Sequence, residues 1–241
     1  MNRSLVMLSS AICIMSTIAT ADIFMKQQTT TVSGKKEKTT TEETTVWIAE
    51  DKMVSQGTES TMIVRLDKDV AWAIDTKKKT YVEIPLSTLI PTDGSNEQQE
   101  AAAALPGMFA NMLKMKVTVE PTTETKQIRD WNCTKYNQTV EMTGGKTTSE
   151  MWVTEDIKIS QDLVKKFSAA FMAQNPGLKQ LGAEMMREAE KIKGYVVYTS
   201  SQSKMMGQES RSTMEVVEMK EDTAPEGIYE VPAKFKKKKY E

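Results

Sequence analysis

The chain has 241 residues, with 32 basic and 33 acidic side chains and no histidine. This balance gives no general attraction to nucleic acid, and the absence of histidine removes the most common general base and zinc ligand. We therefore expect a non-enzymatic protein with no nucleic-acid partner, no cofactor and no metal site. No linker rich in Pro, Gly or Ser divides the chain, which indicates one domain.

Residues 1–21 have the pattern of a secretory signal peptide. Arg3 supplies the positive charge, Leu5–Ile18 is an apolar stretch short for a membrane span, and Ala19–Ala21 has the small-x-small cleavage pattern. Cys13 lies in a poor match to the lipoprotein pattern. We expect export to the periplasm without a lipid anchor, and no transmembrane segment in the mature chain.

The first half of the mature chain predicts strands. Thr-rich segments at 23–32 and 42–49 frame a hairpin around Ser33-Gly34, and 52–56 follows as a short strand. Residues 61–85 then read as a three-stranded meander that Pro85 ends. Val70, Trp72 and Ile74 share one face of its middle strand, because side chains alternate along a strand.

Helical patterns appear in two later regions. After a loop at 93–96, residues 97–115 predict a helix interrupted at Pro106-Gly107. Apolar residues recur at helical spacing from Leu163 to Phe171, with Ser160 as the candidate N-cap, and a second stripe runs from Leu178 to Ile192.

The remaining segments again predict strands, at 116–125, 128–141, 146–154, 195–201 and 212–219, with a hairpin at Gly144-Gly145. The order lacks a βαβ rhythm. We predict an α+β fold in which a strongly curved antiparallel sheet, an incomplete barrel, is covered on its concave side by about three helices. Residues 22–235 would form this domain, and 236–241 a basic tail; its lysines at 236–239 could touch anionic headgroups, but we expect a frayed, soluble tail.

Five segments carry a resemblance to a known family: WIAEDKMVSQG, MIVRLDKDVAWAID, KKTYVEIP, KQIRDWNCTKY and TSEMWVTEDIKI. In this order they resemble an uncharacterised bacterial family of exported proteins, over roughly residues 22–232. That family looks related to the periplasmic lipoprotein carriers of the LolA and LolB type. The resemblance implies a half-barrel closed by helices over an apolar cavity, and makes a hydrophobic ligand the leading expectation. No counterpart of the carriers' lid-locking arginine is found.

The candidate ligand-binding residues are apolar side chains that would face the cavity. Flexible methionine suits a surface that adapts to chains of different shape. The same periodicity is also that of an ordinary core, and the methionine spacing at 108, 112 and 115 leaves Cu(I) as a weaker reading. The candidates are Trp72, Met108, Phe109, Met112, Leu113, Phe167, Phe171 and Met185.

Two further motifs have structural readings. Cys133 has no histidine to activate it, so we expect a small buried apolar side chain, with an intermolecular disulfide as the alternative. Asp67-Lys68-Asp69 lacks the later residues of a calcium loop and predicts a turn.

We therefore predict a periplasmic binding or carrier protein that holds an acyl chain or another hydrophobic small molecule between the curved sheet and Met-rich helices. The alternative is an envelope interaction or sensor module that docks a protein partner through exposed strand edges. A filled interior between Phe109, Phe167 and the strand of Trp72 would favour the alternative.

Overall fold

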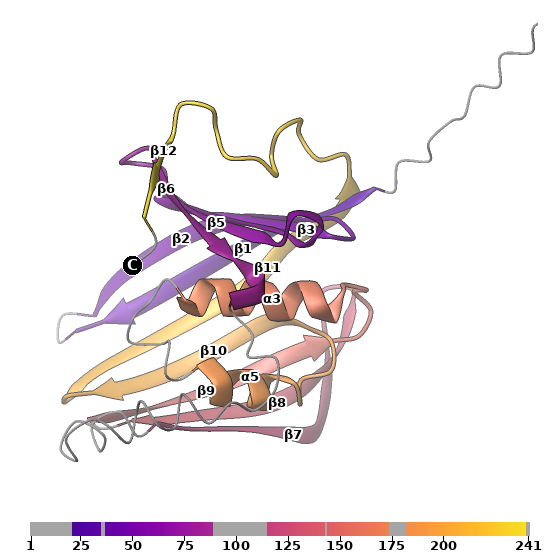
Figure 1. Ribbon diagram of the computed structural model, residues 1–241. Coiled ribbons are helices and arrows are strands. Elements are labelled where there is room, and N and C mark those ends of the chain that lie inside the picture. The colour runs from indigo at the N-terminus through magenta and orange to yellow at the C-terminus, as the bar shows by residue number, and fades with distance from the viewer. Residues whose placement is uncertain (1–20, 35–36, 89–114, 143, 174–181, 240–241) are drawn as a thin grey trace, which may run out of the picture.

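The computed structural model describes residues 21–34, 37–88, 115–142, 144–173 and 182–239, which form one sheet of twelve strands with two α-helices against it (Figure 1). The strand order is β12-β6-β5-β4-β3-β2-β1-β11-β10-β9-β8-β7. All neighbouring pairs are antiparallel except β12 and β6. The strands are β1 Asp22–Ser33, β2 Lys38–Ile48, β3 Lys52–Gln56, β4 Ser60–Arg65, β5 Val70–Asp75, β6 Thr80–Pro85, β7 Met115–Ile128, β8 Trp131–Met142, β9 Gly145–Thr154, β10 Tyr195–Met205, β11 Gln208–Asp222 and β12 Lys236–Lys238.

The predicted meander is confirmed. Strands β4, β5 and β6 pair in sequence order, with Ile63 opposite Trp72 and Trp72 opposite Glu83. The turn after β4 is a 3₁₀ turn, Leu66–Lys68, which Asp69 closes in the left-handed region at φ 50°. Asp67-Lys68-Asp69 is therefore a turn, as expected.

The predicted α+β class with about three helices is wrong. Within the described ranges the fold is mostly β, with two α-helices, α3 Gln161–Ala173 and α5 Gly182–Ala189, and short 3₁₀ turns. The expected helix at 97–115 falls almost entirely outside the described residues. Two strands are longer than predicted, since β10 continues to Met205 and β11 begins at Gln208. The added segments are rich in Ser, Thr and Gln, so they lack the apolar alternation on which the prediction relied.

The sheet curves around α3, which lies between its two halves (Figure 1). Leu163 and Ala170 of α3 are fully buried. They share one core with Met53 and Val64 of one half and Val197 of the other. Burial of such side chains is worth about 1.5–3 kcal/mol each, so this shared core holds the two halves together.

The outer face of β2 to β6 is also buried, which the sequence did not predict. Trp47, Val54, Ile63 and Trp72 form a second core. Residues 223–235, which we call the C-terminal strap, cross this face and pack apolar side chains onto it; these side chains are Ala224, Ile228, Tyr229, Val231 and Phe235. The strap thus makes these strands the middle layer of three.

The chain after the strap is ordered against the sheet. Lys236–Lys238 form β12, which pairs in parallel with β6, and the Lys236 N–H donates to the Lys79 carbonyl at 3.0 Å. The expected frayed tail is therefore wrong for these three residues. Their backbone covers hydrogen-bonding groups of a strand edge that would otherwise be open.

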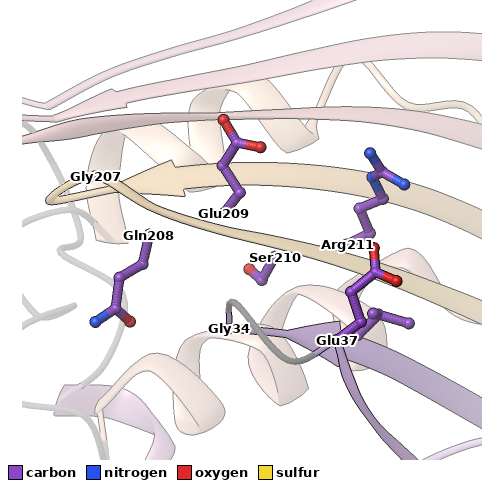
Figure 2. A pocket seen from close by; sticks show the side chains of 8 residues that line it. Gly34, Glu37, Gly207, Gln208, Glu209, Ser210 and Arg211 are labelled. Carbon is purple, nitrogen blue, oxygen red and sulfur yellow. The ribbon is translucent and has the colours of Figure 1, made fainter.

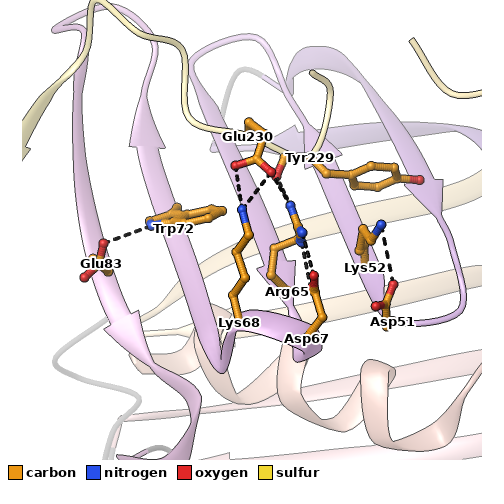
Figure 3. A network of polar contacts seen from close by, with 9 residues as sticks. All are labelled: Asp51, Lys52, Arg65, Asp67, Lys68, Trp72, Glu83, Tyr229 and Glu230. Carbon is orange, nitrogen blue, oxygen red and sulfur yellow. Dashed lines mark hydrogen bonds and ion pairs between the residues drawn. The ribbon is translucent and has the colours of Figure 1, made fainter. Parts of the chain in front are cut away.

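A polar latch fastens the strap to the sheet (Figure 3). The buried Arg65 guanidinium donates to both Asp67 carboxylate oxygens, at 2.6 and 2.7 Å, and to Glu230 of the strap. Lys68 also donates to Glu230, at 2.9 and 3.1 Å. Hydrogen bonds to Arg65 lower the pKa of Asp67, and those from Lys68 and Arg65 lower the pKa of Glu230. Both carboxylates therefore stay charged at neutral pH.

Candidate functional site

Helix α3 has one face in the core and another directed away from it. Ser160 caps the helix as predicted, since its hydroxyl accepts from the Leu163 N–H at 3.3 Å. Leu163, Phe167 and Ala170 recur on the core side. Val164 and Phe171 recur at the same spacing on a neighbouring face, and Phe171 is 55% exposed. Val164 and Phe171 therefore give the side of α3 that faces away from the core an apolar surface.

Helix α5 is fixed to the edge of the sheet by one carboxylate. Glu188 accepts from the outward N–H of Val119 in β7 at 2.8 Å and pairs with Lys191 at 2.7 Å. The hydrogen bond from Lys191, then that from Val119, lower the pKa of Glu188. Lys165 of α3 reaches Glu190 just beyond α5 at 2.8 Å. These contacts hold α5 beside α3.

A groove of about 690 Å³ separates the two helices, and β8 contributes Gln138 to it. Its apolar lining is formed by Val164, Phe167, Phe171, Met185, Met186 and Ala189, and its polar lining by Gln138, Gln161, Asp162, Lys165, Ser168 and Glu190. The volume lies within the range of about 300–1,000 Å³ typical of small-molecule sites. A ligand that is apolar along most of its length and polar at one end matches this combination of apolar and polar side chains.

Three of the predicted ligand-binding residues meet in this groove: Phe167, Phe171 and Met185. Phe167 has a double role, because it also packs against the inner core. The predicted Met108, Phe109, Met112 and Leu113 lie outside the described residues. The sequence prediction omitted Val164 and Met186, although Val164 lies on the same helical stripe as Phe171 and Met186 adjoins Met185.

Trp72 is separated from these residues, which corrects its assignment to the same site. Its ring belongs to the outer core under the strap, and its indole N–H donates to Glu83 at 3.2 Å. Alternation along β5 instead turns the small Ala71 and Ala73 toward α3. We expected the larger side chains to face the helices, but the strap covers them.

The sheet beyond the groove is lined with hydroxyl groups. Thr31, Ser212, Ser201 and Ser149 follow one another across β1, β11, β10 and β9, and Gln138 of the groove is the next cross-strand partner. Thr31 and Ser212 are hydrogen-bonded at 3.3 Å, and Ser149 and Ser201 at 2.8 Å. This strip is therefore polar, and the apolar lining of the groove comes from α3 and α5.

A second hollow, of about 490 Å³, lies where the β1–β2 and β10–β11 turns adjoin (Figure 2). Apart from Val32, its side chains are polar: Glu37, Gln208, Glu209, Ser210 and Arg211, with Gly34 and Gly207 at the turns. This hollow does not suit a hydrocarbon chain.

Cys133 is only 2% exposed and belongs to the inner core. Burial raises the pKa of its thiol, which keeps the sulfur protonated and weakly reactive. The predicted structural role is confirmed, and the intermolecular disulfide has no accessible sulfur in this conformation.

No helix among the described residues is both long and apolar enough to cross a membrane. The fold and the groove define a mostly-β protein with one curved sheet and, between two helices, a groove lined by both apolar and polar side chains. The chain belongs to the family described as Domain of unknown function (DUF4412), whose model matches residues 12–235. The expected membership of an uncharacterised family is thus confirmed.

Similar solved structures include two of PNGF-II. The structure in the C2 space group has a TM-score of 0.40 at 13% identity, covering 89% of this chain and 31% of that one. The structure in the P21 space group has a TM-score of 0.42 at 12% identity, covering 91% and 32%. This chain therefore spans about a third of those proteins. A DUF1329 family protein from Desulfovibrio piger ATCC 29098 has a TM-score of 0.32 at 10% identity, covering 88% of this chain and 91% of that one. No curated protein matches the sequence.

Proposed function

We propose that this protein is a non-catalytic, exported binding or carrier protein, acting in the periplasm, that holds an acyl chain or a similar apolar group between α3 and α5. One observation carries the proposal. Phe171 is 55% exposed beside Met185 and Met186, at a groove of about 690 Å³. Apolar burial contributes roughly 0.8 kcal/mol per methylene, so an acyl chain needs few polar contacts to be held.

The polar lining supports a guest with one polar end. Gln138, Ser168 and the paired Lys165 and Glu190 offer donors and acceptors beside the apolar walls. The five segments resemble an uncharacterised exported family, and the relation which that resemblance implies to carriers of the LolA and LolB type supports a hydrophobic ligand. The site differs from the expected one, because the guest would contact α3 and α5 and not the strand of Trp72.

A fluorescent fatty acid titrated into the mature protein tests this proposal. Phe171→Ser removes an apolar wall, and losing the burial of one large side chain, about 1.5–3 kcal/mol, weakens binding roughly 10-fold or more. Met206→Ser is the matched control, because among the described residues Met206 is the other large apolar side chain with high exposure, 88%, and lies in the β10–β11 turn. Equal affinity of the two variants, or no uptake by the wild-type protein, would refute the assignment.

The packed space between α3 and β3–β4 favours a second candidate, an envelope interaction or sensor module. Met53, Met62 and Val64 fill that space against Leu163. In that function Phe171 would pack against a protein partner. The two candidates differ in one result: the sensor module takes up no fatty acid, whereas the carrier does.

A further inference from the structure

The fold brings two lysine-rich segments together at one edge of the sheet. Lys77–Lys79 form the turn between β5 and β6, and Lys236–Lys239 run along β6 as β12 and the residue after it. The hydrogen bond from the Lys236 N–H to the Lys79 carbonyl, 3.0 Å, joins the segments directly. All seven lysines are exposed. We call this set the lysine ridge.

The ridge has a strong local excess of positive charge. Three of its lysines pair with acids: Lys77 with Glu59, Lys78 with Asp75 at 3.0 Å, and Lys237 with Glu83 at 2.7 Å. Among the described residues, seven lysines against these three paired acids leave an excess of four positive charges, in a chain whose formal net charge is -1. The ridge is therefore a feature of the folded arrangement and not of the overall composition.

The chemistry of the ridge fits a diffuse negative surface. It contains lysine and no arginine. Lysine acts as a flexible point charge, whereas arginine provides the planar fork used to grip individual phosphates or bases. Side chains alternate along the edge strand β12, so its lysines project on both faces of an exposed edge, and the ridge meets a surface edge-on. Clusters of four to eight basic residues are typical of segments that bind anionic lipid headgroups.

We propose that the lysine ridge docks this protein onto the surface of an anionic phospholipid membrane. The contact is electrostatic and reversible, and it uses a face distinct from the α3–α5 groove. It therefore does not depend on the proposed ligand. Binding should weaken with salt, because the Debye length falls from roughly 10 Å at about 0.1 M to about 3 Å at 1 M.

Co-sedimentation with vesicles of one part phosphatidylglycerol to three parts phosphatidylcholine tests the proposal. The mature protein should bind these vesicles at low salt and not bind vesicles of phosphatidylcholine alone. Replacing Lys236, Lys238 and Lys239 with Gln should weaken binding on the order of 100-fold, at about 1 kcal/mol per lysine near the surface. Replacing Lys77–Lys79 with Gln should give a comparable loss of binding. If the C-terminal lysines bound the membrane alone, this variant would bind like the wild type.

The matched control replaces three exposed, ion-paired lysines of β9, β10 and β11 with Gln: Lys146, Lys204 and Lys220. It changes the net charge equally and should retain binding. Circular dichroism melting of each variant confirms that it is folded. Equal loss in the control, unchanged binding in the turn variant, or binding to DNA without binding to vesicles would overturn the proposal. Phe171→Ser should bind vesicles normally, which separates failure of the docking from failure of the groove.

Discussion

The latch between Arg65 and Glu230 gives the sharpest stability prediction. Arg65 is 7% exposed and holds both Asp67 and Glu230. Glu230→Gln preserves the size of the side chain and removes its charge. The guanidinium keeps its two hydrogen bonds to Asp67, so the change isolates the link between the sheet and the strap.

The expected loss of stability in Glu230→Gln lies between the values for a hydrogen bond to a charged group and for an exposed ion pair. A hydrogen bond to a charged group contributes about 1.5–3 kcal/mol, whereas an exposed ion pair contributes about 0.2–1 kcal/mol. The Glu230 side chain is 48% exposed and solvent screens it, while that of Arg65 is only 9% exposed. We therefore expect the free energy of unfolding to fall by about 1 kcal/mol, which lowers the Tm by roughly 2–4 °C for a chain of this size.

Urea and thermal unfolding of four proteins provide the assay: wild type, Arg65→Gln, Glu230→Gln and the double variant. The double-mutant cycle should give a coupling of about 1 kcal/mol. Glu209→Gln is the control, because Glu209 pairs with Lys204 where both side chains are 70% exposed, and it should change stability by a few tenths of a kcal/mol. A coupling near zero, or equal effects of the two Glu variants, would refute the role of the latch.

Three further outcomes follow from the same structure. The pKa values of Asp67 and Glu230 are lowered from 3.8 and 4.5 in the folded protein. The stabilisation by these carboxylates is therefore present above these values and is lost as pH falls. Between about pH 5 and pH 3, the free energy of unfolding should decline less steeply in Glu230→Gln than in the wild type. Cys133 should resist a thiol reagent in native buffer and react fully in denaturant, whereas rapid native reaction would contradict its burial. Leu163→Ala should cost about 2–5 kcal/mol in chemical unfolding, because its side chain is fully buried between α3 and the sheet; a loss below that range would show that α3 packs loosely.

Local patterns predicted the strands well where turns and alternation agree. The meander from β4 to β6 has short apolar runs separated by polar turns, and the Ser160 cap is adjacent to the helix that it starts. Both depend on residues near one another in sequence. The same local reading underestimated β10 and β11, because β-branched and polar side chains extend strands without an apolar signature.

The position of Trp72 could not be predicted in this way, because it depends on a distant segment. Both faces of β5 carry apolar side chains, and the strap at 223–235 decides which face meets α3. Arg65 presents the same difficulty: Asp67 is two residues away, but Glu230 is 165 residues away. An arginine within the apolar run of β4 was the one available sign of a buried polar contact.

The groove lies between α3 and α5, whereas the sequence analysis expected a cavity between the helices and the sheet. Phe167, Phe171 and Met185 were selected by helical spacing and do meet. Helical spacing alone could not distinguish the core side of α3 from the groove side, because apolar side chains recur every three or four residues on both sides. The position of α5 determines which side of α3 lines the groove. The hydrogen bond from the Val119 N–H to Glu188 fixes that position.

Extraction of the natively purified mature protein with organic solvent, followed by mass spectrometry, is the most direct test of a hydrophobic guest between α3 and α5. We predict that the wild type and Met206→Ser release the same acyl-containing molecule in near-stoichiometric amount, and that Phe171→Ser releases much less. An extract without lipid from folded wild-type protein, or equal amounts from all three proteins, would contradict the account.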